Sequence, residues 1–275
     1  MFKQILGGLH RKFGRTSYGL AFAFKLKNQM MAIIRSSLND GIEMESNGEQ
    51  WLLDVIAPSA RCFFDVGANV GNWTQAFLNA RDNEQVLGML FEPAPGTYRI
   101  LSKSMSGLID KRVLKIYEKA VSDELGEISF YEEQGYGETS SFVKEHSGNN
   151  ANLVTVKTTT IDTVVAEENI TYIDMLKIDA EGYDLHVLKG ALNSIKSGLI
   201  GTIQFEYNAP WAYAGGTLYE ALSLLQRYGY RTFILMHDGL RQFDYDVYGE
   251  YYGYSNFIAL SPKAYMQHKQ AFVLC

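Results

Sequence analysis

The chain has 275 residues, of which 47% are apolar, and this is enough for one large globular α/β domain with an N-terminal addition. Its formal net charge of −6 argues against nucleic acid as the main partner, because phosphate binding needs a concentrated positive field. The presence of only Cys62 and Cys275 argues against a disulfide framework, and no run approaches the ~18 apolar residues of a membrane-spanning helix. We therefore predict a cytoplasmic protein.

The N-terminal segment differs in charge from the rest of the chain. Residues 1–35 contain seven Lys and Arg side chains and no Asp or Glu. Apolar residues at 51–56, ended by Pro58, predict a short helix, so we assign 1–57 to a helical extension and 58–275 to the main domain. The extension is expected to pack on the main domain or on a second subunit in a homo-oligomer. The alternative is an interfacial helix that holds the protein near anionic lipid or a lipid-linked substrate.

The main domain begins with a short apolar run that ends at Asp65. Gly67, Asn69 and Gly71 follow at alternate positions, and apolar residues then recur at helical spacing. Glycine adopts positive φ at little cost, and asparagine is the next most tolerant residue. The pattern predicts a strand, a tight turn and a helix, which is the start of a nucleotide-binding βαβ unit.

The next apolar run, 85–91, predicts a buried strand that ends at Glu92. Pro93 cannot continue the ladder, so Glu92 is expected at the carboxyl end of this strand. Glu92 follows Gly71 at about the spacing of ~20 residues at which a dinucleotide or nucleoside site places an acid on the ribose hydroxyls. We therefore assign Glu92 to ribose binding.

Helices and strands continue to alternate along the rest of the chain. A hairpin is predicted at 128–131 and 153–157, and the Gly, Ser and Asn content of 134–152 between them predicts a mobile loop or lid. The other expected elements are a helix from 97, a strand at 113–117, a helix from 158, a strand at 173–178, a helix at 185–195, a strand at 202–208, a helix at 218–228, and strands at 231–235 and 256–260.

This alternation predicts a doubly wound α/β sheet with right-handed crossovers. Ligands bind outside the carboxyl ends of the strands in such sheets. Polar residues that fall at or just after predicted strand ends are expected to converge on one cleft, and they are Asp65, Glu92, Ser122, Asp179, Glu206 and His237.

The first turn favours one cofactor over another. A dehydrogenase normally has G-x-G-x-x-G after the first strand, whereas this chain has Asp65-x-Gly67-x-Asn69-x-Gly71. A carboxylate is repelled by a pyrophosphate and attracted by a cationic ligand. S-adenosylmethionine carries a sulfonium and an amino group and no phosphate, and Glu92 can accept hydrogen bonds from both of its ribose hydroxyls. An NAD-dependent oxidoreductase is the enzymatic alternative.

From about residue 61 to residue 260 the sequence resembles the FkbM-type S-adenosylmethionine-dependent methyltransferases. The resemblance rests on Phe64-Asp65-Val-Gly67-Ala-Asn69-Val-Gly71, Phe91-Glu92-Pro93, Leu176-Lys177-Ile178-Asp179-Ala-Glu181-Gly182, Val187-Leu188-Lys-Gly190-Ala191, Phe205-Glu206 and Asn256-Phe257. The segment around Asp179 is the most specific of these. The family often has Glu two residues after Gly182, where this chain has Asp184.

The resemblance implies a Rossmann-like methyltransferase sheet of seven strands, mostly parallel with an antiparallel last strand. It also implies methyl transfer to a hydroxyl oxygen. Carried over by position, Asp65, Gly67, Asn69 and Gly71 would surround the methionine part of S-adenosylmethionine and Glu92 the ribose, while Ala120, Val121 and Ser122 would line the adenine side. Asp179 is also assigned to cofactor binding. By the same resemblance, the acceptor is expected to be a sugar or glycan, lipid-linked glycans included, or a small secondary metabolite.

Methyl transfer to oxygen also requires alignment of the acceptor and a group that takes its proton. Asp179 is the first candidate base, with capping of the next helix as the competing role. His237 is the second candidate, and Glu206 is assigned to the acceptor pocket. Asp179, Glu181, Asp184 and Glu206 could ligate magnesium, but nothing in their spacing requires a metal, and we predict none.

A non-catalytic role is the alternative from a different class. In that case the domain binds a nucleoside cofactor and assembles a complex through its basic N-terminus and its tyrosine-rich segment at 245–254. Formation of a methylated product distinguishes the enzyme from this assembly subunit.

Overall fold

The computed structural model describes residues 12–37, 46–82, 85–111, 113–132 and 151–271, together with Gly7, His10 and Met44. Contacts between residues divide the chain into two units, Met1–Asp40 and Gly41–Cys275. The main domain was predicted to begin at residue 58, whereas α3 (Glu49–Ile56) belongs to the second unit and packs against α4 (Asn72–Ala80). The predicted lid at 134–152 lies, except for its last two residues, outside the described part of the chain.

The first unit contains α2 (Ser17–Ser37). Thr16 caps the start of this helix, because its hydroxyl accepts a hydrogen bond from the backbone N–H of Gly19 at 2.9 Å. Among the described residues, no helix is long and apolar enough to cross a membrane.

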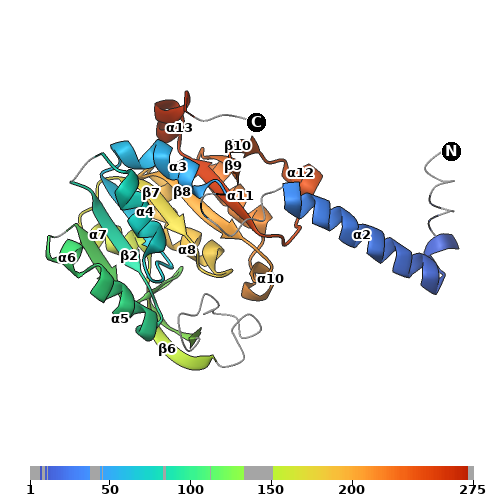
Figure 1. Ribbon diagram of the computed structural model, residues 1–275, viewed down its shortest axis with the longest axis horizontal. Helices are drawn as coiled ribbons and strands as arrows, with labels where there is room; N and C mark the ends of the chain where they lie inside the picture. Colours follow the sequence, from blue (N-terminus) through green and yellow to red (C-terminus); the bar gives the residue numbers. More distant parts are fainter. Residues whose placement is uncertain are drawn as a thin grey trace. The chain divides into compact units, whose positions relative to one another are not determined.

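The second unit is built on a mixed sheet with the order β10-β9-β11-β8-β7-β1-β2-β3 (Figure 1). Its parallel part consists of β1 (Cys62–Val66), β2 (Leu87–Phe91), β3 (Leu114–Tyr117), β7 (Ile173–Ile178) and β8 (Ile200–Tyr207). β11 (Ser255–Leu260) lies antiparallel between β8 and β9 (Arg231–Met236). This Rossmann-like arrangement with an antiparallel last strand confirms the predicted fold class.

The strand count differs from the prediction of seven. In the described part of the chain this sheet has eight strands, because β10 (Gly239–Gln242) forms a hairpin with β9. A second, three-stranded sheet consists of β4 (Ala120–Val121), β6 (Asn152–Thr159) and β5 (Gly126–Glu132). Its antiparallel β5–β6 pair confirms the predicted hairpin, and its apolar side packs together through Ala120, Phe130 and Val156.

The sheet forms the core of the second unit, because its inner strands are buried. All five residues of β1 and all six of β11 are buried, as expected for strands covered on both faces. Phe63 of β1 packs on Phe77 of α4 with ring centroids 4.3 Å apart. Cys62 is buried in the same strand, and burial raises the pKa of its thiol to about 12, as expected for a packing residue.

The remaining helices connect these strands or flank the first and the last of them (Figure 1). The predicted helix at 185–195 is interrupted, because α8 ends at Gly190 and α9 starts at Leu192. A Cβ at Gly190 would lie 2.0 Å from the carbonyl oxygen of Ser122, so the glycine allows α8 to approach β4. The bounds of the connecting helices are η1 (Ala57–Ser59), α5 (Pro95–Ser104), α6 (Ser106–Asp110), α7 (Ile161–Glu167), α8 (Asp184–Gly190), α9 (Leu192–Lys196), α10 (Trp211–Ala214), α11 (Leu218–Arg227), α12 (Tyr245–Tyr248) and α13 (Pro262–His268).

Candidate active site

The turn after β1 has the backbone that the glycine pattern predicts. Gly67, Asn69 and Gly71 all have positive φ, at 76°, 48° and 94°. A Cβ at Gly67 would lie 1.9 Å from the carbonyl oxygen of Asp179, so no other residue fits without moving the backbone. The N–H of Gly67 also donates to the carbonyl of Phe91 at 3.0 Å. The ends of β1, β2 and β7 therefore meet at this turn.

An open cavity lies at these strand ends. Of the residues assigned from the sequence, those that line it are Gly67, Asn69, Glu92, Ala120, Val121 and Asp179. The sequence analysis did not assign several other lining residues to this cavity, namely Thr97 of α5, Lys119, Phe130 of β5 and Glu181. Phe130 could be found only with the fold known, because the small sheet brings it to the cavity from a distant part of the chain.

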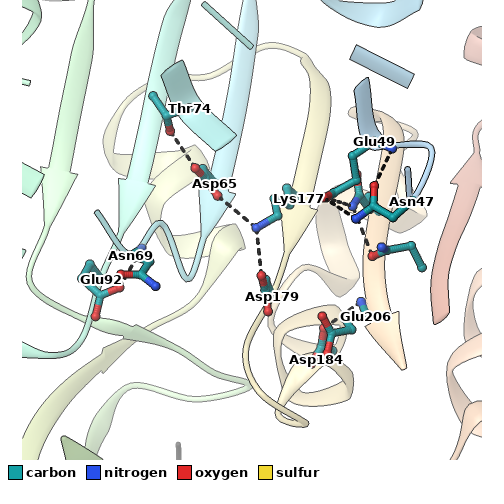
Figure 2. A network of polar contacts seen from close by, with 12 residues as sticks. Asn47, Glu49, Asp65, Asn69, Thr74, Glu92, Lys177, Asp179, Asp184 and Glu206 are labelled. Atoms are coloured by element: carbon teal, nitrogen blue, oxygen red, sulfur yellow. Dashed lines mark hydrogen bonds and ion pairs between the residues drawn. The ribbon is translucent and has the colours of Figure 1, made fainter. Parts of the chain in front are cut away.

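Glu92 lies at the carboxyl end of β2, as predicted, and its side chain is held by two backbone donors. The N–H of Asn69 donates to Oε2 at 2.9 Å (Figure 2), and the N–H of Ala94 donates to Oε1 at 2.8 Å. Each oxygen has a second lone pair that can accept a ligand hydroxyl. Burial raises the pKa of Glu92 to about 7, against the opposing effect of these hydrogen bonds.

Asp65 does not line the cavity, although the resemblance placed it beside the methionine part of the cofactor. Its side chain is fully buried, and Thr74 of α4 donates to Oδ2 at 2.6 Å. Asp65 of β1 lies opposite Lys177 of β7 in the register of the two strands, and Nζ of Lys177 lies 3.9 Å from Oδ1 of Asp65. Asp65 therefore contacts Lys177 and does not contact the cavity directly.

Lys177 joins two parts of the site. Its side chain is 9% exposed, and Nζ lies 3.0 Å from Oδ2 of Asp179, so the ammonium stands between Asp179 and Asp65 (Figure 2). Burial works to lower the pKa of Lys177, but Asp179, Asp65 and Glu49 outweigh it and hold the pKa above its ordinary value. Lys177 is thus a charged residue that fixes the carboxylate of Asp179 at the cavity wall.

A group of acids lies on the other side of Asp179. Glu181 lines the cavity, and burial together with Asp179 raises its pKa to about 8. Glu206 is placed at the end of β8, where it accepts a hydrogen bond from Asn208 and its own N–H donates to Asp184. Burial raises the pKa of Glu206 and of Asp184 well above the ordinary range, and the neighbouring carboxylates add a smaller effect in the same direction. Glu206 lies near the cavity but does not line it.

No three His, Cys, Asp or Glu side chains in the described part of the chain are arranged to hold a metal ion.

Three other assigned residues lie outside the cavity. Gly71 packs on α5 and the residues after it, since a Cβ there would meet Met105 and Leu101 within 3 Å. Ser122 is buried and donates to Asp123, while its neighbours Ala120 and Val121 line the cavity. His237 is in the turn between β9 and β10, with its side chain 66% exposed and 3.5 Å from Asp238.

His237→Gln is therefore expected to change the turnover number by less than about twofold, as for an exposed surface residue. Steady-state kinetics of the variant check this. A loss of tenfold or more would restore His237 as a candidate base.

A buried polar network missed by the sequence analysis lies next to Lys177 (Figure 2). Gln204 of β8 donates to Glu49 at 2.5 Å and to Asn256 of β11 at 3.2 Å. Asn47 donates to the other oxygen of Glu49 at 3.0 Å. The available signals were the Asn256-Phe257 motif and the Asn47-Gly-Glu49 helix start, which mark the two ends of this network.

Comparison with known proteins identifies the family. The model of the methyltransferase FkbM domain matches residues 65–232. Among solved structures, the methyltransferase FkbM from Methylobacillus flagellatus KT aligns with a TM-score of 0.47 at 12% identity, over 73% of this chain and 43% of that one. The precorrin-6y C5,15-methyltransferase from Geobacter metallireducens GS-15 aligns with a TM-score of 0.41 at 9% identity, over 78% and 88%. A search of curated proteins found no match. The family match spans more than half of the chain and contains the turn, Glu92 and Asp179, and the protein belongs to the FkbM methyltransferase family.

Proposed function

We propose that the protein is an S-adenosylmethionine-dependent O-methyltransferase that uses the cavity at the ends of β1, β2 and β7. The observation that carries the proposal is that Glu92 and Asp179 line one cavity from opposite sides of the glycine turn. Glu92 can accept hydrogen bonds from ribose hydroxyls, and Asp179 can accept the proton of a reacting hydroxyl.

The residues present fit S-adenosylmethionine. Glu92 has one free lone pair on each oxygen for the ribose, and the turn at Gly67 has no side chain to block close approach of a ligand. Val121 and Phe130 supply an apolar surface for the adenine ring. The charged methionine part would lie toward Asp179.

When bound, S-adenosylmethionine supplies a methyl group activated by the sulfonium. The acceptor hydroxyl has to lose its proton as the new C–O bond forms. Asp179 is 34% exposed at its side chain, so an entering hydroxyl can reach it, while Lys177 holds one of its oxygens. We assign Asp179 the role of orienting this hydroxyl and taking its proton.

We propose the hydroxyl of a sugar, a glycan or a secondary metabolite as the acceptor, and this step rests on the family. The two large aromatic residues at the carboxyl end of β8 and the start of α10 give this step little support. Tyr207 and Trp211 are fully buried and pack with each other at 5.3 Å between centroids. They stabilise the core and are not available to stack on a sugar.

The proposal is tested by calorimetry of the purified protein with S-adenosylmethionine, its demethylated product and NAD. Binding of either of the first two ligands is the expected result. Binding of NAD alone would contradict the proposal. Incubation with methyl-labelled cofactor and a panel of glycans and polyketide-like alcohols then identifies the acceptor, and labelled product separates an enzyme from a non-catalytic subunit.

Glu92 gives a prediction about pH. Hydrogen bonds from ribose hydroxyls favour the ionised carboxylate, whereas burial holds the free pKa at about 7. Cofactor affinity should therefore rise with pH up to about 7, by nearly tenfold per pH unit below it, and level off above. Glu92→Gln should bind about 10- to 100-fold more weakly at pH 8.

The ratio of wild-type to variant affinity, measured by calorimetry from pH 5.5 to pH 8.5, isolates Glu92 from titration of the ligand itself. A ratio that does not change with pH would show that Glu92 does not bind the cofactor as a carboxylate.

A further inference from the structure

The first unit carries a set of large apolar side chains that α2 leaves exposed. Phe22, Phe24 and Leu26 are 58%, 55% and 50% exposed, and Met30 and Ile33 are 47% and 58% exposed. Exposed large apolar residues scattered singly are normal in proteins, but several on one helix mark an interaction surface. The function of the cavity does not explain them.

At 3.6 residues per turn, five of the exposed apolar side chains of α2 lie on one face of the helix. Tyr18, Phe22, Leu26, Met30 and Ile33 follow one another at spacings of four or three residues, and we call this set the apolar stripe. Leu26 is at its centre.

The two lysines of α2 lie on opposite sides of Leu26. Lys25 and Lys27 are the neighbours of Leu26 in the sequence, so each lies about 100° around the helix axis from Leu26. A long lysine side chain in such a position can reach outward while its methylene groups lie along an apolar surface. This is the arrangement of a helix that lies in a lipid–water interface.

Charge decides between a lipid surface and a second copy of the helix. Residues 1–37 contain basic side chains and no acidic one. Two such helices paired along their stripes would bring like charges together, and the helix offers no carboxylate to compensate. An anionic lipid surface attracts the same charges, by about 1 kcal/mol for each Lys or Arg near it.

We propose that α2 is an interfacial helix that places its apolar stripe in an anionic lipid surface, with Lys25 and Lys27 at the level of the headgroups. The proposal is independent of the methyltransferase activity, because none of these residues lines the cavity.

The chain offers closely matched variants. Phe22→Ser with Leu26→Ser removes two stripe residues, whereas Leu20→Ser with Phe24→Ser removes the same residue types from another side of the helix. The exposed fractions are similar, at 58% and 50% for the first pair and 51% and 55% for the second. Lys25→Gln with Lys27→Gln tests the charges, and the thermal transition of each full-length variant checks that the main unit is folded.

Flotation of the full chain with vesicles is the measurement. We expect binding to phosphatidylcholine vesicles that contain phosphatidylglycerol, and weak binding to phosphatidylcholine alone. The partition coefficient should fall at least tenfold in the Phe22→Ser, Leu26→Ser variant and stay within about threefold of wild type in the Leu20→Ser, Phe24→Ser variant. In the Lys25→Gln, Lys27→Gln variant it should fall about thirtyfold. Raising the salt from about 0.15 M to about 1 M should weaken binding, because the Debye length falls from ~8 Å to ~3 Å.

Three results would overturn the proposal. The first is no binding to anionic vesicles, and the second is equal loss in the two apolar double variants. The third is a dimer in solution that the stripe variant dissociates without any vesicle binding, which would assign the stripe to a second copy. Cofactor binding measured in parallel remains a separate test of the proposed enzyme.

Discussion

Replacing Asp179 by asparagine is expected to lower the turnover number by about 10²- to 10⁴-fold while changing the cofactor dissociation constant only slightly. Asparagine is nearly the same size and its side-chain oxygen can still accept a hydrogen bond from Lys177, which lies 3.0 Å from Asp179. It cannot take a proton from the acceptor hydroxyl. The variant therefore separates proton transfer from the shape of the cavity. Turnover of labelled methyl groups and calorimetry with S-adenosylmethionine measure the two effects.

Glu181→Gln is the matched control in the same cavity. Burial and the charge of Asp179 raise the pKa of Glu181 to about 8, so this side chain is mainly protonated at neutral pH and glutamine resembles it. Turnover at pH 7 should stay within a few-fold of wild type. Equal loss in the two variants would assign the effect to the cavity as a whole, and unchanged turnover in Asp179→Asn would remove Asp179 from the mechanism.

The sequence was informative where a backbone constraint selects the residue type. The turn at Gly67 leaves no space for a Cβ beside the carbonyl of Asp179, and Pro93 ends β2 directly after Glu92. The φ of 76° at Gly67 and the missing N–H of Pro93 act locally, so both strand ends could be predicted before the fold was known. Parallel strands then bring their carboxyl ends to the same edge, and Glu92 and Asp179 line one cavity as expected.

The sequence was less informative about the direction of each side chain. Asp65 is the fourth of five residues in β1, not the residue after it, and it points to Lys177 across the sheet. That pairing follows from the register of β1 and β7, whose residues are more than a hundred positions apart in the chain. The same limit applies to Phe130, which reaches the cavity through the small sheet, and to Glu206, which a strand end places next to the cavity and not in it.

Lys177→Met is expected to lower the free energy of unfolding by about 3–5 kcal/mol, the usual cost of removing one partner from a buried ion pair. Methionine fills a similar volume, so the loss is electrostatic and leaves Asp65 without its cation in a fully buried position. Lys115→Met, on the edge strand β3, is the matched control. Its ion pair with Glu168 has a lysine that is 48% exposed, and such pairs contribute about 0–1 kcal/mol. Urea unfolding at pH 7 measures both variants.

The pH dependence of the stability loss in Lys177→Met identifies the cause of that loss. Burial already raises the pKa of Asp65, and removal of Lys177 takes away the largest opposing effect, so the folded variant holds a proton on Asp65 that the unfolded chain has lost. Stability then falls as pH rises above the unfolded pKa, and the defect should be larger at pH 8 than at pH 5. Adding Asp65→Asn should recover part of the loss at pH 8, because it removes the unpaired charge. A defect that is equal at both pH values, and unchanged in the double variant, would indicate lost packing in place of lost charge compensation.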